Sequence, residues 1–77
     1  MAAMRSLREL KGLARTHSIA NLKKLAESDS DLANQLEFVM PSRSVIRAED
    51  LKMLDEGREC KLWGRDPNGE RVCLEWA

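Results

Sequence analysis

The sequence has little of the residue types from which catalytic and metal centres are built. It contains one histidine, His17, and two cysteines, Cys60 and Cys73, among 77 residues. Zinc needs several nitrogen or sulfur ligands at paired spacings, which these residues do not offer. Nucleophilic catalysis needs a base beside the nucleophile, and Ser18, next to the histidine, is better explained as a helix cap. We therefore expect no metal and no catalytic nucleophile.

Other ligand-binding motifs are missing too. The acidic run that begins at Asp29 starts like a calcium loop, but Ala33 and Asn34 occupy the positions of a ligand and of the turn glycine. The four glycines are scattered, so the sequence contains no phosphate-binding loop. These absences predict that the protein is not an enzyme and uses no cofactor.

Long apolar runs are absent as well. No stretch approaches the roughly 18 apolar residues that indicate a transmembrane helix, and charged residues interrupt the first fifteen positions. Two cysteines also do not form a disulfide-dense framework. We expect a cytoplasmic protein with reduced thiols, no signal peptide and no membrane partner.

What is present is typical of a soluble globular protein. The chain is 43% hydrophobic and 34% charged, and its formal net charge is zero. Residues 1–77 are enough for a single small domain. A domain of this size has only about 3–5 kcal/mol of net stability, so a partner or self-association would help it.

The charges are distributed unevenly along the chain. Residues 1–24 contain six basic residues and one acidic residue, residues 25–56 contain three basic and eight acidic residues, and residues 57–77 are balanced. The protein therefore resembles an electric dipole more than a uniformly basic nucleic-acid binder. Head-to-tail contacts in a homo-oligomer are one possible consequence.

Helical periodicity dominates the first half of the chain. Apolar residues recur at spacings of three and four over residues 4–26. His17 and Ser18 offer a break, with Ser18 as the N-cap of a second helix, so one kinked helix and two short helices both fit. After the polar run 27–31, the period resumes from Leu32 to Met40 and ends at Pro41. We predict an N-terminal helical hairpin of two or three short helices.

Shorter elements are expected between residues 41 and 57. Residues 41–44 are typical of a connection, and Val45-Ile46 is predicted as one short strand. Ala48–Glu56 is predicted as a short helix that ends at Gly57.

A β-hairpin is predicted at the C-terminus. Asp66-Pro67-Asn68-Gly69 is typical of a type I turn followed by a glycine bulge, between two runs rich in β-forming residues. This loop places Asp66 opposite Glu70 and implies three further cross-strand pairs: Gly64 with Val72, Leu62 with Leu74, and Cys60 with Trp76.

This register assigns the hairpin side chains to two faces. The face expected in the core contains Cys60, Leu62, Val72, Leu74 and Trp76. The opposite face contains Lys61, Trp63, Arg65, Arg71, Cys73 and Glu75. Because the two cysteines project from opposite faces, we expect both to be free thiols.

The polar hairpin face is the first candidate binding surface. Trp63 lies there among Lys61, Arg65 and Arg71, and tryptophan with arginine is enriched at interface hot spots and can stack on bases. The alternative is that helices or the neighbouring arginines cover Trp63.

The first helix provides a second candidate surface. Arg8, Lys11 and Arg15 form a basic stripe beside its leucines, which suits phosphates or an acidic groove; the alternative is an ordinary solvated face. A helix-turn-helix over residues 18–40 is disfavoured. Its recognition helix would carry Asp31 and Glu37 but no lysine or arginine, which is unfavourable in a DNA groove.

Together these features predict an α+β fold: the helical hairpin, a short helix, and a C-terminal hairpin or small three-stranded antiparallel sheet. The general profile is that of small regulators and inhibitors encoded by bacteria and mobile elements. We expect a non-catalytic regulatory or inhibitory protein that binds a protein partner. The alternative is a small nucleic-acid-binding regulator that uses the basic first helix and the Trp63 face.

Overall fold

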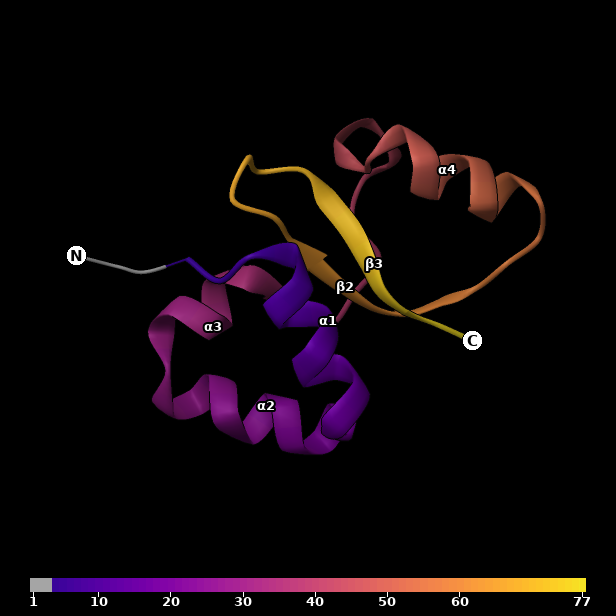
Figure 1. Cartoon of the computed structure of the whole chain (residues 1–77). Helices are drawn as coiled ribbons and strands as arrows, with labels where there is room; N and C mark the ends of the chain where they lie inside the picture. Colours follow the sequence, from indigo (N-terminus) through magenta and orange to yellow (C-terminus); the bar gives the residue numbers. More distant parts are fainter. Residues whose placement is uncertain (1–3) are drawn as a thin grey trace.

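The computed structural model describes residues 4–77, whose elements form an α+β fold with helices first and a β-hairpin last (Figure 1). In chain order they are α1 (Leu7–Thr16), α2 (Ile19–Ser28), α3 (Ser30–Gln35), β1 (Leu36–Glu37), the 3-10 helix η1 (Arg43–Val45), α4 (Ala48–Asp55), β2 (Cys60–Arg65) and β3 (Arg71–Trp76). The predicted fold class is confirmed. Within this part of the chain, no helix combines the length and apolarity needed to cross a membrane.

The strands form one antiparallel sheet in the order β1-β2-β3, with helices on both faces. Figure 1 shows α1, α2 and α3 on one side of the hairpin and α4 on the other. Each side has its own apolar cluster. The buried members of the first are Leu10, Ala14, Leu22, Leu32, Leu36, Leu62, Val72 and Leu74. The second contains Ile46, Trp63 and Cys73, with Leu51, Leu54, Cys60 and Trp76 packed against it.

Side-chain caps explain where the first helices begin. The hydroxyl of Ser6 accepts a hydrogen bond from the backbone N–H of Glu9, and Ser18 caps α2 in the same way. The two alternatives for residues 4–26 are thereby resolved in favour of two helices. Asp29 then caps α3 by accepting the backbone N–H of Leu32 at 3.1 Å.

The predicted helix over 32–40 is wrong beyond Gln35. Gln35 is fully buried, and its amide accepts the backbone N–H of Arg5 at 2.8 Å and donates to the Arg5 carbonyl at 2.9 Å. The next two residues leave the helix and pair with β2, Leu36 opposite Gly64 and Glu37 opposite Trp63. Pairing with the sheet therefore outweighs the local helical period.

The structure of the segment before the hairpin agrees only in part with the prediction from the sequence. Instead of a strand at Val45-Ile46, the chain forms η1, and Ile46 alone makes a parallel bridge to Arg71. The predicted short helix is confirmed as α4, with Gly57 following it at a φ of 92°.

The predicted turn is present in the hairpin. The backbone N–H of Asp66 donates to the Glu70 carbonyl, Gly69 has a φ of 88°, and the Asp66 carboxylate accepts the N–H groups of Asn68 and Glu70. Asp66 is consequently buried although it lies in a loop.

The predicted register holds at both ends of the hairpin and differs at Leu62. Gly64 faces Val72 and Cys60 faces Trp76 as expected, but Leu62 faces Glu75 instead of Leu74. Two register shifts flank Leu62, and such irregularities redirect side chains. Leu62, Val72 and Leu74 join the first cluster as predicted, whereas Cys60 and Trp76 pack with the second cluster beneath α4.

Candidate functional site

The structure buries the tryptophan of the predicted hairpin surface. Only 4% of Trp63 is exposed, and the side chain belongs to the cluster of Ile46 and Cys73, with Leu51 and Leu54 of α4 packed against it. Its ring makes an edge contact with Trp76 at a centroid distance of 6.5 Å. The prediction of an exposed recognition face around Trp63 is therefore wrong, and the alternative of a covered tryptophan is correct. The alternation of side chains along the hairpin assigns Trp63 to the polar face of the sheet. It does not show that α4 covers this face.

The two arginines of the same surface pair with a carboxylate of β1. Arg71 Nε lies 2.7 Å from Glu37 Oε1, and Arg65 Nη2 lies 3.7 Å from the same oxygen. These pairs join the short first strand to both strands of the hairpin. Lys61 is exposed and forms none of the ion pairs found in residues 4–77. Trp63, Lys61, Arg65 and Arg71 thus do not form one open binding surface.

The cations of α1 lie in a different layer of the molecule. Arg8 and Arg15 are exposed, Lys11 is half-buried, and the buried side of α1 presents Leu10 and Ala14 to the first cluster. α1 packs on the sheet face opposite to α4, so the structure separates these cations from Trp63.

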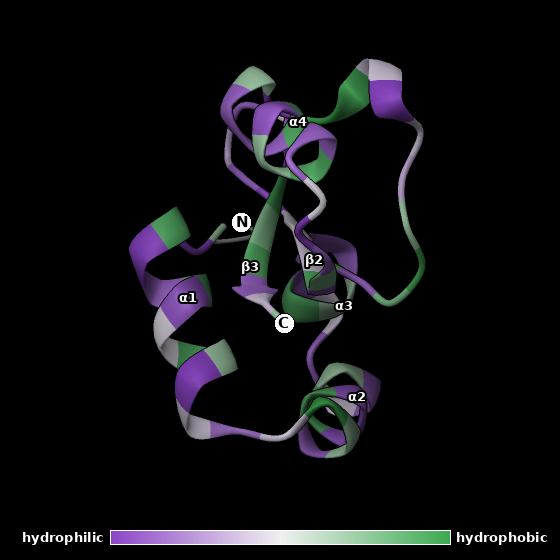
Figure 2. Cartoon of the chain, turned by 90° about the vertical axis from the view of Figure 1, so that its right-hand side faces the viewer, coloured by the Kyte–Doolittle hydropathy of each residue, from purple (hydrophilic) through white to green (hydrophobic). Residues whose placement is uncertain are grey.

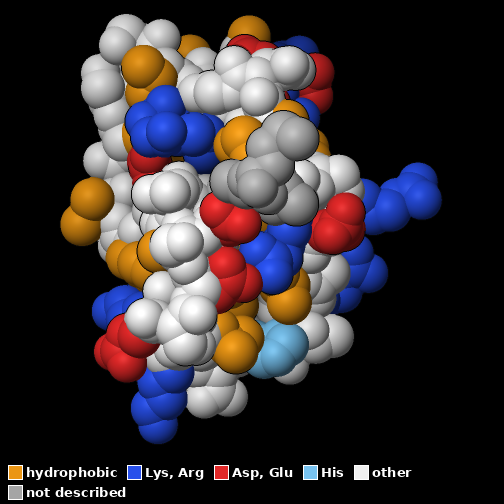
Figure 3. All heavy atoms as spheres, turned by 90° about the vertical axis from the view of Figure 1, so that its left-hand side faces the viewer, with side chains coloured by type: hydrophobic (Ala, Val, Ile, Leu, Met, Phe, Trp, Pro, Cys, Tyr) orange, Lys and Arg blue, Asp and Glu red, His pale blue; other side chains and the backbone are white. Residues whose placement is uncertain are grey.

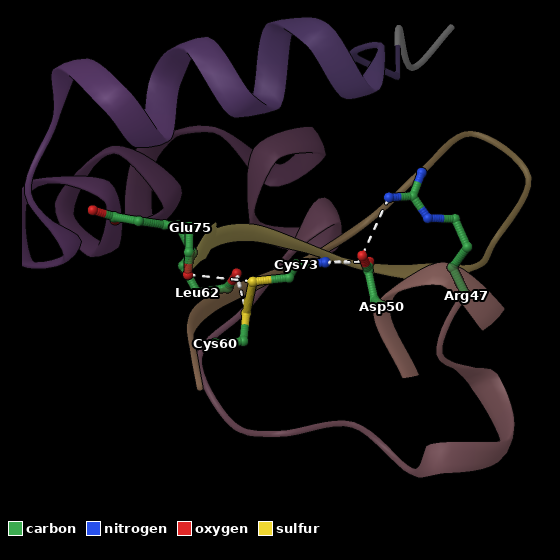
Figure 4. Close-up of a disulfide and its surroundings, with 6 residues drawn as sticks. All are labelled: Arg47, Asp50, Cys60, Leu62, Cys73 and Glu75. Carbon is green, nitrogen blue, oxygen red and sulfur yellow. Dashed lines mark hydrogen bonds and ion pairs between the residues drawn. A yellow bond between two sulfur atoms is a disulfide. The ribbon is translucent and has the colours of Figure 1, made fainter. Parts of the chain in front are cut away.

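The two cysteines form a disulfide, which overturns the prediction of free thiols. Cys60 and Cys73 are bonded with a Cα–Cα distance of 5.9 Å. The register shifts around Leu62 bring Cys60 to the Cys73 side of the sheet. Backbone carbonyl oxygens of Leu62 and Glu75 lie 3.1 and 3.3 Å from the sulfurs (Figure 4). The cytoplasmic location was expected from the lack of a signal peptide, together with reduced thiols, and the disulfide contradicts the expectation of reduced thiols.

A buried carboxylate lies beside this disulfide. Asp50 of α4 is 2% exposed, and its Oδ2 accepts the backbone N–H of Cys73 at 2.8 Å (Figure 4). Its Oδ1 accepts from Arg47 at 3.3 Å. Asp50 therefore attaches α4 to the outer edge of β3, a structural role that the sequence did not reveal. Among residues 4–77, no group of three histidine, cysteine, aspartate or glutamate side chains could hold a metal ion.

A second carboxylate stabilises the start of α3. The backbone N–H of Leu32 and then the Arg5 guanidinium, 2.9 Å away, hold the pKa of Asp29 below its ordinary value. Asp29, Glu9 and Asp31 line a surface hollow of about 340 Å³ together with Met4 and Arg5. Arg5 is the one cation among these five lining residues and offsets only part of the charge of the three carboxylates. Figure 3 shows acidic and basic side chains interspersed over this side of the molecule.

An exposed apolar segment follows β1, where the sequence predicts the end of a helix. Phe38, Val39 and Met40 are 38%, 77% and 55% exposed and belong to no regular element. The ammonium of Lys23 lies 5.4 Å from the centre of the Phe38 ring. In the chain this stretch follows β1 and precedes η1, and Figure 2 shows it in green beside the sheet, on the opposite side of the molecule from α1. We call Phe38–Met40 the apolar segment.

One sequence signal could have revealed this surface. Phe38 does not fit the apolar stripe of the helix predicted up to Met40, whereas Val39 and Met40 do. A large aromatic residue on the solvent side of a predicted helix indicated that the helix ends earlier.

Comparisons with protein-family models, curated proteins and solved structures find no significant match.

Proposed function

We propose that the protein is non-catalytic and acts as a regulator or inhibitor by binding a protein partner through the apolar segment. The observation that carries the proposal is the exposure of three consecutive apolar side chains, Phe38, Val39 and Met40. Single exposed apolar residues are normal, but a consecutive run on a loop is unfavourable in water unless a partner covers it. Burial of about 25 cal/mol per Å² of apolar surface would then favour association.

The surroundings of the apolar segment fit a protein interface. Apolar side chains form its centre, and Lys23 beside Phe38 supplies a polar rim. Methionine and phenylalanine are enriched at such interfaces, and a loop held by a rigid sheet is a common position for binding residues.

Two paired variants test this proposal. Val39→Asp with Met40→Asp should abolish retention of partner proteins from a nuclease-treated extract of the host cells on the immobilised protein. Ala20→Asp with Ala48→Asp is the matched control, because it adds the same charge at exposed first-turn positions of α2 and α4, where aspartate is tolerated. Equal retention by both variants, or no specific retention by the wild-type protein, would contradict the proposal.

The alternative function is a nucleic-acid-binding regulator. The cations of α1, which form none of the ion pairs found among residues 4–77, are the observation that favours it. However, the burial of Trp63 removes the side chain that would stack on bases, and Glu37 engages Arg65 and Arg71. Retention that disappears on nuclease treatment and falls steeply with salt would favour this alternative.

A further inference from the structure

The solvent side of α1 forms a second surface, separate from the apolar segment. Arg8, Lys11 and Arg15 follow Leu7 along α1, and the four side chains line a shallow hollow of about 290 Å³. Leu7 is half-buried and packs against the first apolar cluster at the N-terminal end of this hollow. Arg8 and Arg15 are two helical turns apart, a distance of about 10 Å along the axis. We call these four residues the α1 surface.

None of the three cations has a carboxylate partner in the described residues 4–77. Every ion pair found there involves Arg5, Arg43, Arg47, Arg65 or Arg71. Three of the six basic residues of 1–24 therefore lie on one side of α1, where no carboxylate of residues 4–77 pairs with them. A negatively charged partner would be attracted to this face.

The composition of the α1 surface favours a peptide over a nucleic acid. Leu7 supplies an apolar contact beside the cations, which an acidic helix with one apolar side chain can match. A phosphate backbone would extend beyond these three cations and has no apolar group that matches Leu7.

We propose that the α1 surface docks an acidic amphipathic helix of a partner polypeptide. Carboxylates spaced over two helical turns of the partner pair with Arg8, Lys11 and Arg15, and an apolar residue beside them contacts Leu7. The apolar segment lies on the opposite side of the molecule, so both surfaces can be occupied together (Figure 2). The protein would then bridge two polypeptides, although docking on α1 does not depend on the apolar segment.

The test uses synthetic probes and fluorescence anisotropy at low salt. The main probe is a fluorescein-labelled helical peptide of about 14 residues, four turns, with glutamates along one stripe and a central leucine. The comparison probes are the same peptide with serine for leucine, the same peptide with glutamine for every glutamate, and a labelled single-stranded oligothymidylate.

Two triple variants of the full chain locate the binding. Arg8→Gln, Lys11→Gln and Arg15→Gln together should weaken binding of the glutamate–leucine peptide about tenfold, since each exposed ion pair adds only a few-fold in affinity. The control is Lys24→Gln, Lys52→Gln and Lys61→Gln, which removes the same charge from exposed lysines elsewhere and should change affinity less than threefold. Circular dichroism should show that both variants remain folded.

Four results would overturn the proposal. The first is no binding of the glutamate–leucine peptide to the wild-type protein. The second is equal loss of binding in the two triple variants, which indicates a non-specific charge effect. The third is tighter binding of the oligothymidylate through the same arginines, which indicates a nucleic-acid surface. The fourth is equal affinity for the serine-substituted peptide, which means that Leu7 makes no contact.

Discussion

At the scale of single residues, the contact between Gly64 and Leu74 leaves no room for a side chain. A Cβ at Gly64 would lie 2.6 Å from Leu74 Cδ1 and 2.9 Å from its Cγ. Gly64→Ala should therefore lower the free energy of unfolding by about 1–3 kcal/mol, as overpacked core substitutions do. Urea denaturation measures this change.

Gly12 provides the matched control for that substitution. It lies inside α1, and an added Cβ would meet no heavy atom within 4 Å. Gly12→Ala should stabilise the protein by about 0.5–1 kcal/mol through helix propensity. If both alanines stabilised the protein, Leu74 would have to move aside freely, and the packing argument would fail.

The oxidation state of the cysteines gives a second prediction at this scale. The unfolded, unreduced protein should contain no reactive thiols, because Cys60 and Cys73 are bonded to each other. After reduction, the same titration should find two thiols per chain. Two thiols before reduction would mean that Cys60 and Cys73 are not bonded to each other in the native protein.

At the scale of elements, the attachment of α4 depends on one buried carboxylate. Asp50→Ala leaves the Cys73 N–H without a partner beneath the helix and should cost about 1–3 kcal/mol of unfolding free energy. Glu49→Ala, at the residue before Asp50, should change the free energy of unfolding little, because the Glu49 side chain is 79% exposed. Similar losses in the two variants would show that Asp50 does not hold α4.

The start of α3 gives a prediction about pH. The folded-state pKa of Asp29 is lowered, so its charge stabilises the folded protein above the unfolded-state pKa, which is near 3.8. That contribution is lost as the pH falls through the lower folded-state pKa. Asp29→Asn keeps a capping residue but no charge, so the variant should be less stable than wild type at neutral pH, with the difference vanishing in acid. Denaturation at neutral and acidic pH checks this. A constant difference would contradict it.

The elements also show how far the sequence predicts the fold. Ser18, Asp29 and the turn at Asp66 are local signals, and each lies where the structure begins or turns an element. The early end of α3 is not local, because it depends on Gln35 binding the backbone of Arg5, 30 residues away. The shifts around Leu62 are likewise tertiary, and they alone bring Cys60 to Cys73.

At the scale of the whole molecule, the candidate surfaces were predicted less well than the fold. Arg8, Lys11 and Arg15 share the surface expected from helical spacing. Trp63 does not contribute to an open surface, because alternation along a strand shows which side chains share a face but not whether a distant helix covers it. The exposure of Val39 could not be predicted from local pattern either. It depends on the pairing of Leu36 and Glu37 with β2, which ends the helix before Val39.

The disulfide should contribute much of the stability of the whole molecule. It closes a loop with a sequence separation of 13 and lies in the cluster between the sheet and α4. Closing a loop of this size restricts the unfolded chain and contributes about 3 kcal/mol, comparable with the roughly 3–5 kcal/mol that the core of so small a domain supplies by itself. Reduction should therefore leave the protein marginally folded, with a large fall in the urea midpoint followed by tryptophan fluorescence. A Cys60→Ser and Cys73→Ser double variant should have this low midpoint with or without reductant. If reduction left the wild-type midpoint unchanged, the two apolar clusters and the Asp50 attachment would be sufficient to hold the fold without the covalent link.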